Sequence, residues 1–231
     1  SLMSRVLLPI LPAYIGLSLC TLAYQGYFIK YLPLLLLTLV IVIPVYGIWT
    51  LLLYYFAGSY SGEKPWKVLK EYLPVCKMAL MTRSSAATGK YSLEAASKCE
   101  CLEQDLTKDA LPLFTQIHHC GSVLTEVFFA MMISRILYGS VPAPGTMVIF
   151  SVLLATCSIG TPGLPWGTVM VSLGTLTGIL KFGDSGVALM FAVFAIHDGF
   201  AAACNMTCDG ALALILTGYA KKREISKNTD I

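Results

Sequence analysis

Charged residues are scarce in this sequence, and their scarcity excludes most classes of soluble protein. Only 13% of the 231 residues are Asp, Glu, Lys or Arg, against about 25% in soluble domains. The net charge is +3, and the basic residues stand in short clusters between apolar runs, which indicates topology signals and not a nucleic-acid surface. Hydrophobic residues make up 56% of the chain and the mean hydropathy is +0.73. We therefore predict an integral membrane protein that lies in the lipid bilayer and binds no nucleic acid.

Cysteines in polar surroundings are also few, which argues against a disulfide framework and against zinc. Five of the eight cysteines lie inside apolar segments, where free cysteine acts as a small hydrophobe. Cys99 and Cys101 form a single C-x-C pair in a polar stretch, and without a second ligand pair this is a weak zinc signal. The five apolar-segment cysteines are Cys20, Cys120, Cys157, Cys204 and Cys208.

The sequence also lacks an initiator methionine. It begins at Ser1 and enters an apolar run within a few residues. That run is too long for a signal peptide and lacks a small-residue cleavage site. We therefore expect the chain to be a fragment of a longer protein.

Long apolar runs predict the membrane spans. Residues 6–29 and 31–57 each exceed the roughly 20 residues that cross a bilayer, so residues 1–61 are expected to form two transmembrane helices. The following loop is rich in Lys and is predicted to be cytoplasmic by the positive-inside rule. A further helix is expected over residues 110–138 and a final helix over 185–220. The basic residues after it place the tail, residues 221–231, in the cytoplasm of a multi-pass protein of the inner or plasma membrane.

Two segments between these spans are interrupted and predict re-entrant helical hairpins. Residues 68–98 turn polar at the Ser/Thr-rich sequence TRSSAATG. Residues 142–180 are uncharged but are broken by SIGTPGLPWG. Irregular backbone at membrane depth is tolerated where protein buries it or where it lines a cavity. Residues 62–231 would then form a transport core of two inverted repeats, the layout by which secondary transporters build a site near the midplane.

The last apolar span keeps two aspartates and an asparagine, Asp198, Asp209 and Asn205. An unpaired carboxylate in the membrane costs several kcal/mol, so intramembrane acids are functional by default. The spacings of seven and four place all three residues on one helix face, and the two aspartates are roughly 16 Å apart. Two sites are therefore predicted, one at Asp198 with Asn205 and one at Asp209. The alternative is that these acids pair with a basic residue inside the bundle, for which Arg83 is the candidate.

Four motifs, in this order, resemble those of a known family: TRSSAATG, DALPLFTQIHHCGS, LLATCSIGTPGLPWG and DGFAAACNMTCDGALALILTGYA. The chain resembles the second half of the dicarboxylate/amino acid:cation symporters, the glutamate transporter homologues. The resemblance implies an all-α membrane protein of polytopic helices with two re-entrant hairpins. It also implies an elevator-type symporter for an amino acid or dicarboxylate, which is a homotrimer in its full-length form. The first two spans would be the family's fifth and sixth helices.

The resemblance also implies roles for individual residues. Asp198 would receive the substrate's ammonium group, Asn205 would hold substrate and lend a carbonyl to sodium (Na+), and Asp209 would bind sodium. The implied substrate-binding residues come from both hairpin tips and the final helix: Arg83, Ser84, Ser85, Thr161, Pro162, Gly163, Asp198, Ala201, Ala202 and Asn205. The implied ion-site residues are Asn205, Asp209, Ser158, Ile159, Thr161 and His118.

Two departures from the family pattern bear on specificity and coupling. Ala201 stands where carriers of acidic amino acids have an arginine, so either the substrate is a small neutral amino acid or Arg83 supplies the charge. HHCGS replaces the family's Asn-Met-Asp-Gly-Thr, so Cys120 replaces a sodium-binding aspartate, and imidazole and thiol are poor sodium ligands. We expect one sodium site to be lost and a second, built from carbonyls, to remain. Coupling to protons through His118 is the alternative.

The sequence gives less support to other functions than to a symporter. An enzyme with Cys120 as nucleophile is disfavoured, because adjacent residues on a helix point about 100° apart and His119 cannot face the thiol. An anion-conducting channel remains an alternative, as does a degenerate paralogue that no longer transports.

Overall fold

The computed structural model describes residues 26–161, 163 and 167–223, together with scattered positions between 10 and 24. Within these residues all regular structure is helical. The expected span over residues 6–29 and the tail beyond residue 223 lie largely or wholly outside the described residues. The helices are α2 (Tyr27–Ser61), α3 (Pro65–Thr82), α4 (Ser85–Ser97), α5 (Gln104–Ile117), α6 (Cys120–Tyr138), α7 (Pro144–Ile159), α8 (Gly167–Gly178) and α9 (Asp184–Arg223).

Three stretches of the described chain are long and apolar enough to cross a membrane: Leu36–Ser61, Gln104–Tyr138 and Asp184–Arg223. Pro33 and Pro44 lie inside α2 without ending it, as is common where neighbouring groups in a membrane protein satisfy the freed carbonyls. These spans, with the high hydropathy, confirm the prediction of an integral membrane protein.

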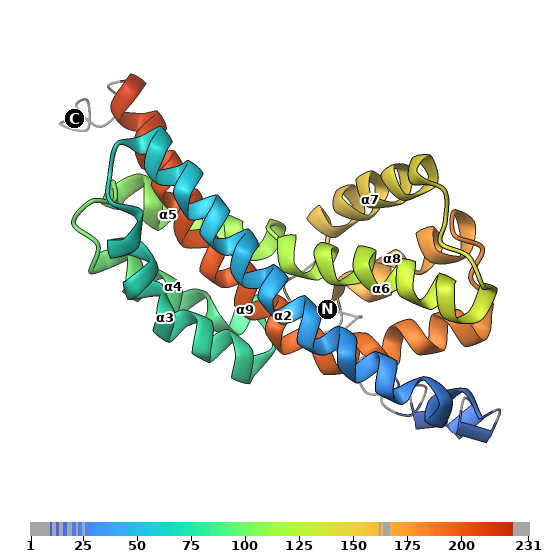
Figure 1. Ribbon diagram of the computed structural model, residues 1–231. Helices are drawn as coiled ribbons and strands as arrows, with labels where there is room; N and C mark the ends of the chain where they lie inside the picture. Colours follow the sequence, from blue (N-terminus) through green and yellow to red (C-terminus); the bar gives the residue numbers. More distant parts are fainter. Residues whose placement is uncertain are drawn as a thin grey trace.

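Helix α9 is the axis on which α2, α3, α4, α5, α6 and α8 pack, whereas α7 packs on α8 and α6 (Figure 1). Its N-terminal half contacts α6 and α8 in a hydrophobic core that includes Phe129, Phe150 and Phe194. Its C-terminal half packs with α2 and α3 in a second core that includes Tyr54 and Tyr72. Burial of α9 on nearly every side explains why its sequence is apolar all round, without a solvent-facing stripe.

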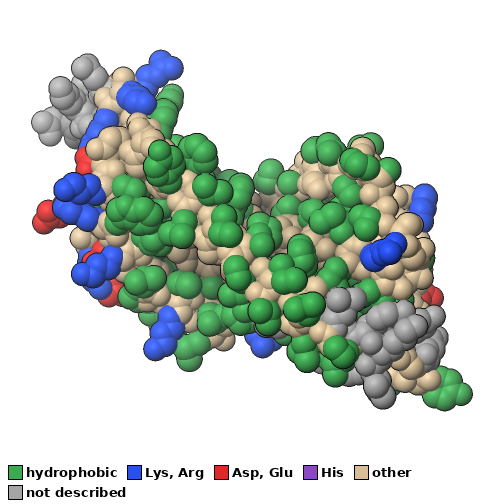
Figure 2. Space-filling model, viewed as in Figure 1, with side chains coloured by type: hydrophobic (Ala, Val, Ile, Leu, Met, Phe, Trp, Pro, Cys, Tyr) green, Lys and Arg blue, Asp and Glu red, His purple; other side chains and the backbone are tan. Residues whose placement is uncertain are grey.

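The outer surface is apolar over much of its area. Side chains of α7 such as Val148, Ile149 and Val152 are more than half exposed, and Figure 2 shows hydrophobic side chains across the middle of the face, with Lys and Arg gathered toward its ends. Contiguous exposed apolar surface of this extent is expected for a protein that contacts lipid.

Two pairs of consecutive helices form helical hairpins. In the first, Arg83 ends α3 in the left-handed region (φ 54°), and Ser84 caps α4 by accepting a hydrogen bond from the Ala87 amide. In the second, α7 ends at Ile159 and α8 begins at Gly167. The first tip lies at Arg83 and Ser84 in the Ser/Thr-rich sequence, where the Ser84 cap begins a new helix. The second tip lies in the Gly/Pro-rich sequence, whose composition does not favour a continuous helix. Their entry and return on one side of the membrane remains a prediction.

The helix expected over residues 110–138 is interrupted. α5 ends at Ile117 and α6 begins at Cys120, with His118 and His119 outside helical geometry. A new helix start leaves amide donors without partners, and Asn205 on α9 fills this need because its Oδ1 accepts from the Gly121 amide at 2.7 Å. The break is therefore held by a residue that is distant in sequence.

Candidate functional site

The two hairpin tips contact each other directly. The carbonyl oxygen of Gly163, in the second tip, accepts from the Ser84 hydroxyl at 2.9 Å and from the Ala86 amide at 3.0 Å. The Gly163 amide in turn donates to the side chain of Gln116 at 3.3 Å. A Cβ at position 163 would lie 2.7 Å from the Thr115 carbonyl oxygen, so the tips approach this closely only with glycine there.

The break between α5 and α6 contacts the second tip through His119. His119 is buried, and its Nε2 lies 3.1 Å from the carbonyl oxygen of Thr161 and 2.9 Å from that of Gln116. Neutral imidazole with a proton on Nε2 satisfies both contacts as a donor. His119 was not among the predicted site residues, although its pairing to Thr161 places it beside both tips.

Both tips, the start of α6 and α9 enclose a small polar cavity. Its volume is about 10 Å³, room for about one water molecule. Six of its lining residues belong to the predicted substrate set. His119 and Ser122 lie inside a quoted motif but were assigned no role, and Thr168 lies one residue beyond another motif. The six are Arg83, Ser85, Gly163, Asp198, Ala202 and Asn205.

Opposite charges line this cavity. Asp198 on α9 is buried, and Arg83 reaches across from the first tip, where its guanidinium donates to the Ala195 carbonyl at 3.2 Å. Ala201 does not line the cavity and is fully buried. The backbone of α6 approaches α9 there, since a Cβ on Gly121 would lie 2.6 Å from the Ala201 carbonyl. Among the residues that line this cavity, the positively charged side chain is therefore that of Arg83, on the first tip.

The remaining predicted substrate residues lie near the cavity or outside the description. Ser84 and Thr161 are buried in the contacts between the tips and the break. Pro162 lies outside the described residues. Asn205 lines the cavity but also donates to the Ser122 hydroxyl at 3.1 Å, so its amide joins α9 to the start of α6.

Asp209 lies in a separate polar site nearer the C-terminal end of α9. It is fully buried, and its Oδ1 is 2.8 Å from Nδ1 of His118. Its other oxygen, Oδ2, is buried without a hydrogen-bond partner among the described residues. A buried carboxylate with one partner needs compensating positive charge, which a protonated His118 or a bound cation can supply.

The C-terminal ends of α5 and α7 meet beside this site. Ile117, His118, Ser158 and Ile159 line one crevice of about 550 Å³. Helix C-termini carry partial negative charge and unpaired carbonyls. The Ser158 carbonyl already accepts from the Thr161 amide at 3.0 Å, but a carbonyl oxygen has two lone pairs and retains capacity for a cation.

A family model described as "Sodium:dicarboxylate symporter family" matches residues 1–219. The chain belongs to this family. The match covers nearly the whole chain and confirms the predicted family. The sodium:dicarboxylate symporter family comprises transporters and not enzymes, and its description implies symport of a small molecule with sodium. A comparison with curated proteins finds no match.

In this family member two further ionisable groups are buried, one on α6 and one on α9. Glu126 on α6 is fully buried and lies near the hydroxyls of Thr168 and Ser172 on α8. His197 on α9 packs against Phe129, with ring centroids 4.6 Å apart. Glu126 was visible in the sequence as an intramembrane carboxylate, but its neighbours on α8 are not readable from spacing.

In the C-x-C pair, Cys99 is buried, and this burial raises the pKa of its thiol to about 12. Neither Cys99 nor Cys101 belongs to a cluster of three metal-ligating side chains among the described residues.

Proposed function

We propose that this chain transports a small acidic amino acid across the membrane together with a cation. The observation that carries the proposal is the cavity in which Arg83 and Asp198 face a common space between the two tips. An amino acid with an anionic side chain matches these charges, since its ammonium group pairs with Asp198 and a carboxylate pairs with Arg83.

The charge of Asp198 favours an amino acid over a simple dicarboxylate. A dicarboxylate carries no ammonium group and would bring negative charge toward a buried carboxylate. Like charges at short range in a site of low dielectric are strongly unfavourable. The Ala86 amide at the start of α4 donates to the Gly163 carbonyl in the closed site, and it would be released for a further carboxylate when the second tip moves, since helix N-termini commonly bind anions.

The tightness of the cavity supports a gate at the second tip. A cavity of about 10 Å³ cannot admit an amino acid, so substrate entry requires the tip to move. Four hydrogen bonds hold it, two at the Gly163 carbonyl, one at the Gly163 amide and one at the Thr161 carbonyl. At about 0.5–1.5 kcal/mol each, these bonds total a few kcal/mol, which substrate and ions can offset. We also propose an elevator-type motion, in which the transport core carries the closed site across the membrane.

The coupling cation is proposed to bind at Asp209. Its Oδ2 offers a buried anionic ligand without a partner among the described residues, and sodium prefers such oxygen ligands. A second cation would bind where α5 and α7 end, at the carbonyls of Ser158, Ile159 and Thr161. When no ion is bound, protonated His118 would neutralise Asp209. The same protonation of His118 would couple transport to protons if sodium were not required.

Reconstituted uptake tests the substrate assignment. We expect aspartate to compete better than serine, alanine or succinate for uptake into proteoliposomes. Arg83→Ala should weaken aspartate binding roughly 10- to 150-fold, because a hydrogen bond to a charged group contributes about 1.5–3 kcal/mol. Lys90→Ala is the matched control, since Lys90 is an exposed base on the same hairpin. Serine or alanine outcompeting aspartate in the unaltered protein would establish the neutral-substrate alternative instead.

Assembly and orientation follow from the same proposal. We propose that the full-length protein is a homotrimer with its C-terminal tail in the cytoplasm. Crosslinking in native membranes that yields a trimer, and protease access to the tail only from the cytoplasmic side, would agree with it. Linear, substrate-independent current would instead favour a channel.

A further inference from the structure

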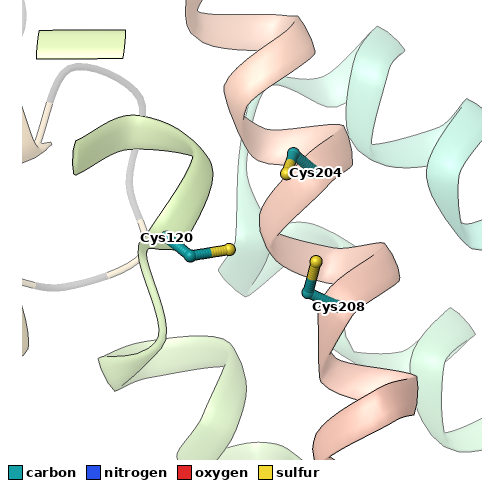
Figure 3. A group of neighbouring side chains, drawn as sticks. All are labelled: Cys120, Cys204 and Cys208. Atoms are coloured by element: carbon teal, nitrogen blue, oxygen red, sulfur yellow. The ribbon is translucent and has the colours of Figure 1, made fainter. Parts of the chain in front are cut away.

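Three cysteines that lie apart in the sequence converge between α6 and α9. Cys120 is the first residue of α6, and Cys204 and Cys208 lie one turn apart on α9. Their sulfur atoms all lie within 4.8 Å of one another. Figure 3 shows the three side chains pointing toward a common space, one from α6 and two from α9. In the sequence each is indistinguishable from a small apolar residue, because Cys120 is 84 and 88 positions from Cys204 and Cys208.

We propose that Cys120, Cys204 and Cys208 form a binding site for a soft, thiophilic metal ion of the Cu(I) type. A metal at the centre of three sulfurs with bonds of about 2.3 Å requires sulfur–sulfur separations of about 4.0 Å. The sulfurs are already within 4.8 Å, so closure needs each to move by roughly 0.5 Å or less. Each thiol that binds as thiolate releases one proton.

The number and type of ligands select the metal. Among the described residues this cluster supplies three ligand atoms, whereas structural zinc is nearly always bound by four. Thiolates select soft ions such as Cu(I) over the hard cations sodium, calcium and magnesium. The three-sulfur site is thus chemically distinct from the neighbouring oxygen-rich site at Asp209, although Cys208 precedes Asp209 directly.

The surroundings have the features of a metal site beyond the ligands. The Thr50 hydroxyl on α2 lies 3.6 Å from the sulfur of Cys208 and 3.8 Å from that of Cys204, within reach as a donor to bound sulfur. Cys120 lines the 550 Å³ crevice on one side, and Cys204 lines a second crevice of about 350 Å³ on the other. These crevices provide entry paths. The start of α6 adds partial positive charge beside an anionic ligand set.

A bound metal would clamp the start of α6 to α9. This junction also carries Asn205 and Gly121, so the metal would stabilise the fold where the polar cavity is built. The proposal does not depend on transport. If the unaltered protein transports substrate but binds no Cu(I), the metal site is overturned and the proposed function stands. If it binds Cu(I) but does not transport, only the proposed function is overturned.

Metal titration of the purified, fully reduced protein tests the site. Under anaerobic conditions, competition with a chromophoric Cu(I) chelator should reveal about one Cu(I) per chain bound through sulfur. Cys204→Ala should weaken Cu(I) binding by more than about 100-fold, and Thr50→Val, which leaves the ligands in place, by roughly 10-fold. Cys157→Ser is the matched control, since Cys157 is a free, exposed cysteine on α7. Cu(I) should also raise the melting temperature of the unaltered protein and of Cys157→Ser, but not of Cys204→Ala.

Several results would overturn the site. They are equal Cu(I) binding by Cys204→Ala and Cys157→Ser, or tighter binding of Zn(II) than of Cu(I). A disulfide within the trio of the protein as isolated, found as a mass two hydrogens lower in non-reducing peptide mapping, would also overturn it. Thr50→Val keeps all three thiols, so it tests the site even if a cysteine variant fails to fold.

Discussion

Replacing Asp209 by Asn should abolish the stabilisation of the protein by sodium. Asp209 is fully buried and has one hydrogen-bond partner, His118, at 2.8 Å. Asparagine keeps the size and one oxygen of the side chain but removes the charge that a cation needs. The substitution therefore separates the cation site from the packing of α9.

The expected magnitude follows from ligand linkage. A cation that binds only the folded protein stabilises it by about 2.7 kcal/mol at 100 times its Kd. For a chain of this size that corresponds to a rise in melting temperature of roughly 5–10 °C. In Asp209→Asn this rise should fall to within error. Without sodium the variant should be at least as stable as the unaltered protein, because the attraction within a buried His118–Asp209 ion pair only partly offsets the cost of desolvating its two charges.

Thermal unfolding in detergent, scanned against sodium with choline as the control cation, measures both effects. Asp109→Asn is the matched control, since Asp109 is an exposed aspartate on α5, and it should keep the full sodium response. If Asp209→Asn kept the same sodium-dependent rise as Asp109→Asn, the assignment of the cation to Asp209 would be refuted.

Two further substitutions test how the tips and the break are held. Gly163→Ala should destabilise the contact between the tips by about 1–3 kcal/mol, because its Cβ would lie 2.7 Å from the Thr115 carbonyl. Faster hydrogen exchange at the Ala86 amide would report it, and unchanged exchange would contradict the close approach. Asn205→Ala should cost about 1–3 kcal/mol, since it leaves the buried Gly121 amide without its acceptor. Thermal unfolding would measure this loss, and a variant as stable as the unaltered protein would show that Asn205 does not cap α6.

The tips and the polar face of α9 could be predicted from sequence because their signals are local. Turn residues near Arg83 and Gly163 interrupt apolar runs, and the seven- and four-residue spacings put Asp198, Asn205 and Asp209 on one face. The ligands of both sites stay predictions, because the lining of a closed cavity does not by itself identify the molecule that enters it.

Contacts between distant segments could not be predicted. His118 and Asp209 are 91 positions apart, and no spacing rule relates residues on separate helices. The break after Ile117 was also missed, because its stability depends on an acceptor from α9, and apolar periodicity runs through it. The three-cysteine cluster could not be predicted for the same reason. Each cysteine gives no signal alone, and only the packing of α6 on α9 brings the three sulfurs together.

The most direct test of the account is the uptake of radiolabelled aspartate into proteoliposomes that contain the full-length protein. We predict accumulation driven by an inward sodium gradient, lost on replacing sodium by choline, and strongly reduced in Arg83→Ala but not in Lys90→Ala. Failure to accumulate aspartate, or its accumulation at an equal rate in Arg83→Ala, would contradict a carrier whose first tip supplies the charge for an acidic substrate.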